Sequence, residues 1–103
     1  MFKLNPNPTF KTTVSLSVPG SAQSAAVEVT FKHLSRSALR DYFAGLEGKQ
    51  DSEGLSEIIV GWSGVDAEYS REALGQLLDN YPASAAELFE AFRRELLEAR
   101  RKN

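Results

Sequence analysis

The chain has 103 residues, of which 42% are hydrophobic and 25% are charged, and its formal net charge at pH 7 is -2. We expect one domain over residues 1–103, because this length allows one modest core and not two. The charge provides no basic field for nucleic acid, and the absence of cysteine excludes disulfides, thiolate catalysis and cysteine-bound zinc.

Residues 1–8 form a segment that two prolines interrupt, and it is too short to be a signal peptide. No apolar run in the sequence approaches the length that spans a membrane. We therefore expect a soluble, intracellular protein that does not bind a membrane.

Two alternating segments then predict an antiparallel β-hairpin. In the first, polar residues separate the apolar side chains of Phe10, Val14, Leu16 and Val18. Pro19-Gly20-Ser21 marks a turn. The second segment alternates in the same way through Ala25, Val27, Val29 and Phe31. A lone hairpin is marginally stable in water, so its apolar face must pack against helices or another subunit.

Ser35 is placed to cap a helix that continues to about Leu46. Its apolar side chains recur at helical spacing and are Leu39, Tyr42, Phe43 and Leu46. Glycines at 45 and 48 mark its end. Residues 49–53 are polar and without periodicity, so we expect a mobile loop there.

A second helix is predicted from spacing alone. Large apolar side chains stand at positions i, i+3, i+4 and i+7, namely Leu55, Ile58, Ile59 and Trp62. Gly61 and Gly64 bracket the tryptophan, as glycines at helix ends often do. We expect this helix to end near Trp62.

The last third of the chain predicts two more helices. Ser70 can cap a short helix that carries Leu74, Leu77 and Leu78 and ends at Asn80. Tyr81-Pro82 then forms a corner, because proline is tolerated in the first turn of a helix. The final helix places one apolar face at Ala85, Leu88, Phe89, Phe92 and Leu96. The expected fold class is α+β, with an N-terminal antiparallel β-hairpin followed by about four α-helices.

No group of side chains predicts catalysis or metal binding. His33 is the only histidine and closes the second strand. Asp66 and Glu68 beside Tyr69 could form an acid and base pair, but a solvated loop at a helix start is favoured. Asp51 and Glu53 lack the further oxygens of a calcium loop. We expect no enzyme, no metal and no cofactor.

The final helix carries Arg93-Arg94 and Arg100-Arg101-Lys102, which invite an anion-binding interpretation. Acidic residues are interleaved with these cations at Glu87, Glu90, Glu95 and Glu98. Glutamate and arginine four residues apart stabilise a solvated helix without any ligand. We therefore favour a solvated helix and expect no binding of nucleic acid.

Trp62 admits two interpretations. As a core residue it would seal the apolar stripe from Leu55, and Trp62→Ala would cost several kcal/mol. As a contact residue it would be a rigid anchor of the kind that dominates interfaces. Phe89 and Phe92 can be interpreted in the same two ways, and a core position is favoured for each.

The second half of the chain also holds an ordered series of short motifs. These are Gly61-Trp62-Ser63-Gly64-Val65, an acidic stretch, the Ser70-capped helix, Tyr81-Pro82, the final helix and Lys102-Asn103. From about Leu55 onward the series resembles the small tail assembly chaperones of long-tailed, siphovirus-type bacteriophages. The N-terminal strand pair shows a weaker likeness.

The resemblance implies a phage protein of the host cytoplasm that is absent from the mature virion. It would bind the tape measure protein, keep its apolar helices soluble and help recruit tail tube protein. Self-association is a further property of such chaperones. The matching region holds the residues that we predict to contact a partner, which are Trp62, Tyr81, Phe89, Phe92 and Arg93.

The resemblance further implies a longer product made by a programmed ribosomal frameshift. Arg101-Lys102-Asn103 can be encoded by a run of adenines on which a ribosome slips back one base. An AAG codon for Lys102 would count against slippage.

Other functions are compatible with this sequence. A structural tail or head-tail connector subunit would be retained in the virion, although the short hairpin argues against a tube subunit. A small regulatory or toxin-neutralising protein would bind one partner through its last helix and would lack an overlapping downstream reading frame.

Overall fold

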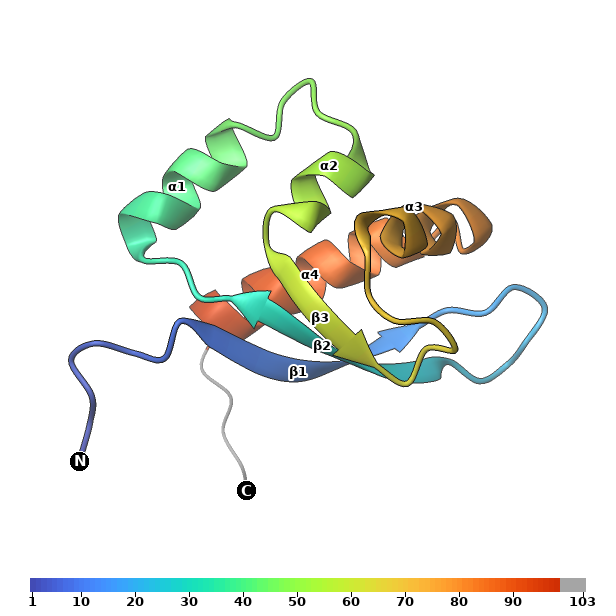
Figure 1. Ribbon diagram of the computed structural model, residues 1–103, viewed down its shortest axis with the longest axis horizontal. Coiled ribbons are helices and arrows are strands. Elements are labelled where there is room, and N and C mark those ends of the chain that lie inside the picture. The colour runs from blue at the N-terminus through green and yellow to red at the C-terminus, as the bar shows by residue number, and fades with distance from the viewer. Residues whose placement is uncertain (99–103) are drawn as a thin grey trace.

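The computed structural model describes residues 1–98. Arg100-Arg101-Lys102 and the predicted slippage run lie outside the described residues. A three-stranded antiparallel sheet and four helices make up the described part (Figure 1). In chain order they are β1 (Thr9–Leu16), β2 (Ala25–Lys32), α1 (Arg36–Ala44), α2 (Asp51–Ser56), β3 (Ile59–Ser63), α3 (Arg71–Asn80) and α4 (Ser84–Leu97). The expected α+β class, with an N-terminal hairpin before the helices, is confirmed.

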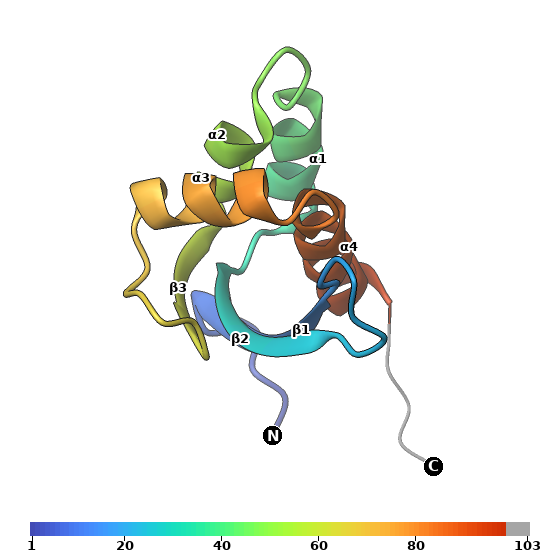
Figure 2. The ribbon, with the colours of Figure 1, turned by 90° about the vertical axis from the view of Figure 1, so that its right-hand side faces the viewer.

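The sheet is curved, and the helices lie on its concave side (Figure 2). Strand β2 is central, with β1 and β3 as its neighbours. In the β1–β2 hairpin, Phe10 pairs with Phe31 and Val14 pairs with Val27. Five of the eight apolar side chains in the predicted alternation are buried, namely Val14, Leu16, Val27, Val29 and Phe31. Phe10 and Val18 are half-buried, and Ala25 is exposed near the hairpin turn. The sheet thus supplies one wall of the core.

Strand β3 replaces the C-terminal half of the helix predicted from Leu55 to Trp62. It pairs with β2 so that Phe31 is opposite Ile59 and Val29 is opposite Trp62, with Val60 as an extra residue. In a regular strand, residues three apart point to opposite faces. The bulge at Val60 brings Ile59 and Trp62 to the same face. Their spacing therefore imitates a helix, and the helix prediction for this segment was wrong.

The expectation of a mobile loop over residues 49–53 was also wrong in its second half. Asp51 and Glu53 form the first turn of α2, where acidic side chains favour the helix dipole. The Tyr42 hydroxyl donates a hydrogen bond of 2.7 Å to the Gly54 carbonyl. Gly54 is buried, and a Cβ atom there would lie 2.6 Å from Leu46 Cδ2. Contacts with α1, which the local sequence does not reveal, therefore fix this short helix.

The helix starts at Ser35 and Ser70 are confirmed. The Ser35 hydroxyl accepts a hydrogen bond from the Ala38 amide at 3.2 Å, and Ser70 accepts one from Ala73 at 3.0 Å. Helix α1 ends at Ala44, slightly before the expected end. At the corner after α3, the buried Ser84 hydroxyl donates to the Tyr81 carbonyl at 2.6 Å. This bond fixes the angle at which α4 leaves the corner.

Helix α4 closes the core against the hairpin. Phe92 has no exposed surface and lies 5.3 Å from Phe31 between ring centroids. Phe10 stacks on Phe92 at 6.2 Å, and Tyr42 meets Phe92 edge-on at 6.0 Å. Phe92 therefore joins β1, β2, α1 and α4 in one aromatic cluster.

We expect Phe92→Ala to lower the free energy of unfolding by about 3–5 kcal/mol, because it leaves a cavity in this cluster. Urea denaturation measures the change. Phe43→Ala is the matched control, since Phe43 is 37% exposed on α1 and its truncation should cost about 1 kcal/mol or less. Equal losses for the two variants would contradict the assignment of Phe92 to the core.

The stability should also depend on alkaline pH through Tyr42. Burial, and to a smaller extent the charge of Glu57, raises the pKa of Tyr42 well above its ordinary value. An unfolded tyrosine loses its proton near pH 10, whereas folded Tyr42 keeps it. The free energy of unfolding should thus fall as pH rises above about 10, and this fall should be shallower in Tyr42→Phe. Urea denaturation across this range provides the comparison, and identical slopes would refute the linkage.

Candidate functional site: an apolar groove around Trp62

A groove with a volume of about 710 Å³ lies beside Trp62. It opens where the hairpin, the chain after β3 and helix α3 meet. Its lining residues are Leu16, Val18, Ala25, Val27, Trp62, Gly64, Val65, Asp66, Ala67, Ala73, Gln76, Leu77, Asn80 and Tyr81. We call this set the Trp62 groove. Most of its lining is apolar, and Asp66 is its one charged residue.

Trp62 is half-buried, so it is neither sealed in the core nor free in solvent. The β3 bulge turns its side chain to the same face as Val29. Its Nε1 donates a hydrogen bond of 2.8 Å to the Ala67 carbonyl, and its ring meets Tyr69 edge-on at 5.1 Å. These two contacts hold the indole rigidly while part of it faces the groove.

The chain between β3 and α3 forms one rim of the Trp62 groove. Gly64 turns it with a φ of +91°, and a Cβ atom there would lie 3.4 Å from the Ala26 carbonyl oxygen. Burial raises the pKa of the Tyr69 phenol, and the nearby charge of Arg71 opposes this shift. The rim is thus built on a left-handed glycine and a partly buried tyrosine.

Helix α3 forms the opposite rim, which the sequence analysis did not identify as part of a site. Ala73 and Leu77 recur four residues apart, as do Gln76 and Asn80, so one side of the helix lines the groove. Tyr81 follows at its C-terminal end and is half-buried. The structure therefore brings Trp62 and Tyr81, two of the predicted contact residues, into one groove.

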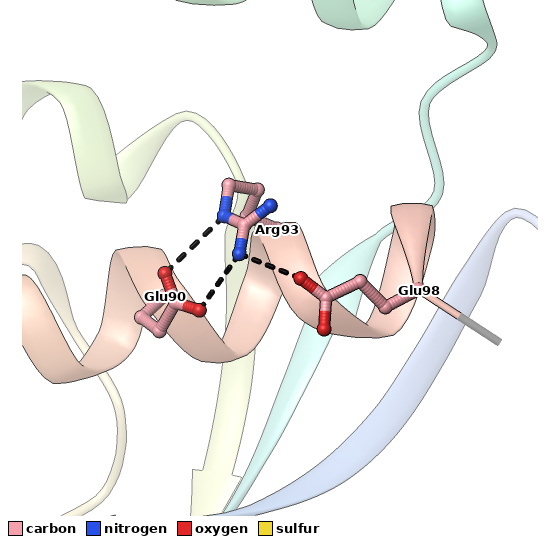
Figure 3. A network of polar contacts seen from close by, with 3 residues as sticks. All are labelled: Glu90, Arg93 and Glu98. Carbon is pink, nitrogen blue, oxygen red and sulfur yellow. Dashed lines mark hydrogen bonds and ion pairs between the residues drawn. The ribbon is translucent and has the colours of Figure 1, made fainter. Parts of the chain in front are cut away.

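The other predicted contact residues lie on α4 and do not line this groove. Phe92 is fully buried, and Phe89 is half-buried near Gly54, where a Cβ atom would lie 3.6 Å from its Cζ. Arg93 forms ion pairs with Glu90 at 2.9 Å and Glu98 at 2.8 Å (Figure 3). The hydrogen bonds that Arg93 donates to both glutamates raise the pKa of Arg93, and Arg93 lowers the pKa of Glu90.

One further polar contact holds the groove in place. The Ser17 amide donates to Glu87 Oε1 at 3.0 Å, and the Ser17 hydroxyl donates to the other carboxylate oxygen of Glu87. This pair joins the end of β1 to α4 across 70 residues of sequence. No local pattern in the sequence indicates it, because both residues look like ordinary surface positions.

Among residues 1–98, no group of three or more histidine, cysteine, aspartate or glutamate side chains could hold a metal ion. None of the helices within that range has the length and apolar character needed to cross a lipid bilayer. An open groove whose lining residues are mostly apolar, with Trp62 and Tyr81 among them, is suited to holding an amphipathic surface.

Comparison with known proteins gives one family match. A family model described as "Phage tail assembly chaperone" matches residues 1–103, the whole chain. No curated protein and no solved structure matches the chain.

We expect Trp62→Phe to lower the free energy of unfolding by about 0.5–1.5 kcal/mol, because it removes the hydrogen bond to Ala67. It should also speed amide hydrogen exchange over residues 64–69. Urea denaturation and exchange mass spectrometry measure the two effects. Tyr81→Phe is the matched control in the same groove, since no hydrogen bond of its hydroxyl is seen among the described residues. Unchanged exchange in Trp62→Phe would contradict a structural role for the indole N–H.

Proposed function

The chain belongs to the phage tail assembly chaperone family, and on this premise we propose that it binds the tape measure protein during tail assembly. It keeps apolar helical segments of that protein soluble and helps recruit tail tube subunits around it. It acts in the host cytoplasm, without catalysis or cofactor, and is left out of the mature virion. We also propose that the chain associates with further copies of itself, as the sequence resemblance predicts.

The Trp62 groove carries this proposal. A helix satisfies its backbone hydrogen bonds internally, so a chaperone for helices has only to cover apolar side chains. The groove offers such a surface between rigid walls, with Trp62 and Tyr81 as aromatic anchors. Aromatic residues dominate binding energy at interfaces because they bury much area with little loss of entropy.

Helix α4 contributes in two ways. Phe92 stabilises the sheet on which the groove is built, because it packs on strand β2 through Phe31 at the other end of the hairpin. Phe89 and Arg93 lie on surfaces that remain partly exposed. We propose them as secondary contacts outside the groove, where the mixed charges of α4 keep the complex soluble.

Co-expression with the tape measure protein encoded in the same tail gene cluster tests the proposal. We expect this chain to raise the soluble fraction of that protein severalfold and to co-purify with it. The double change Trp62→Ala and Leu77→Ala should abolish both effects, because it removes the anchor and part of the opposite rim.

Phe43→Ala is the control, since it truncates an exposed aromatic residue on α1, away from the groove. Circular dichroism confirms that the variants are folded. A tape measure protein that stays insoluble beside the unchanged chain would refute the proposal. Mass spectrometry of purified particles addresses the alternative, because a structural subunit would be found there in stoichiometric amount.

A further inference from the structure

The charge around the Trp62 groove differs from that of the rest of the chain. Residues 16–27 carry no charge, and residues 62–81 carry four acidic residues and one basic residue, a net of -3. The whole chain has a net charge of -2, so the remaining residues together carry +1. The acidic residues are Asp66, Glu68, Glu72 and Asp79. Negative charge is therefore concentrated in the two chain segments that supply the rims of the groove.

These four carboxylates are exposed and have no counter-ion among residues 1–98. Ion pairs in that range join Lys49 to Glu57 and Arg93 to Glu90 and Glu98, all outside the groove. Arg71 is the one cation in residues 62–81, and its charge opposes the rise that burial causes in the pKa of Tyr69. Asp66 alone among the four lines the groove. A cationic ligand would thus meet a negative charge at the edge of an apolar floor.

The lining and volume of the groove favour a helix over an extended strand. An extended ligand needs hydrogen-bond partners for its backbone amides. The amide side chains that the lining offers for this purpose are those of Gln76 and Asn80. A helix needs none of these, because its backbone bonds are internal. A volume of about 710 Å³ accommodates several apolar side chains from one helix face rather than the helix itself.

From this combination we infer that the groove selects an amphipathic helix with a basic flank, and that Asp66 is the residue that sets this preference. Apolar side chains at positions i, i+3, i+4 and i+7 fill the floor between Trp62 and Leu77. A lysine or arginine beside that stripe pairs with Asp66. An acidic helix with the same apolar face is repelled. The inference rests on the proposed role of the groove as the surface that binds a partner.

The test uses two synthetic helical peptides of about 18 residues, or five turns, without tryptophan. Both carry the same leucine stripe, and their flanking positions are lysine in one and glutamate in the other. Trp62 is the only tryptophan in the chain, so its fluorescence reports binding at the groove itself. We expect a blue shift on binding, because the half-exposed indole becomes covered.

The basic peptide should bind at least about tenfold more tightly than the acidic one at about 0.05 M salt, and this ratio should shrink at about 0.5 M as the charges are screened. Asp66→Lys should reduce the ratio by about fivefold or more, the scale of removing an exposed ion pair and adding a repulsion. Asp41→Lys, an identical change at an exposed site on α1, should leave it within about twofold.

Equal binding of the two peptides, or a preference that survives Asp66→Lys, would overturn the inference. So would the absence of any fluorescence change with either peptide. The salt series on the unchanged chain tests the charge preference even if Asp66→Lys proves unstable. A chain that binds the basic peptide but does not solubilise the tape measure protein retains this inference and loses the proposed function. A chain that solubilises the tape measure protein but does not prefer the basic peptide retains the proposed function and loses the charge preference.

Discussion

The fold and the groove both depend on one irregularity in the sheet, the bulge at Val60. A three-stranded sheet must bury one face, and β3 is short, with only a few side chains to give to that face. The extra residue lets Ile59 and Trp62 both point inward, so one strand serves two purposes. Ile59 packs in the core with 2% exposure, and Trp62 reaches past the core edge into the groove. The core and the groove are therefore neighbouring parts of one apolar surface.

Regular periodicity in this sequence predicted structure well, and irregular geometry did not. The alternation around Val14 and Val29 and the caps at Ser35 and Ser70 were confirmed because they reflect local rules of strands and helices. The helix prediction for the segment after Gly54 was wrong, because a bulged strand and a helix can both place apolar residues three apart on one face. Residues 51–53 became helical through contacts with α1, which composition does not reveal.

The candidate site was predictable only in part. Trp62 and Tyr81 were identified through the ordered motifs that carry the family resemblance, and they line one groove. The far rim on α3 was missed because Leu77 looks like any core residue in sequence, and its partial exposure follows from how α3 sits over the sheet. Asp66 was assigned to a solvated loop, which is its local setting. Its place beside an apolar floor exists only in three dimensions.

The bond between Ser17 and Glu87, with the packing of α4 on β1, has a consequence for biosynthesis. The hairpin leaves the ribosome well before α4, the helix that packs on it, because β1 and β2 precede the other described elements in the chain. At about 5–20 residues per second, some seventy residues of intervening chain take several seconds to translate. During that interval the apolar face of the hairpin lacks the cover that α4 later supplies, and closing so long a loop slows the final step. A member of a tail assembly chaperone family thus exposes an apolar sheet face of its own while it is being synthesised.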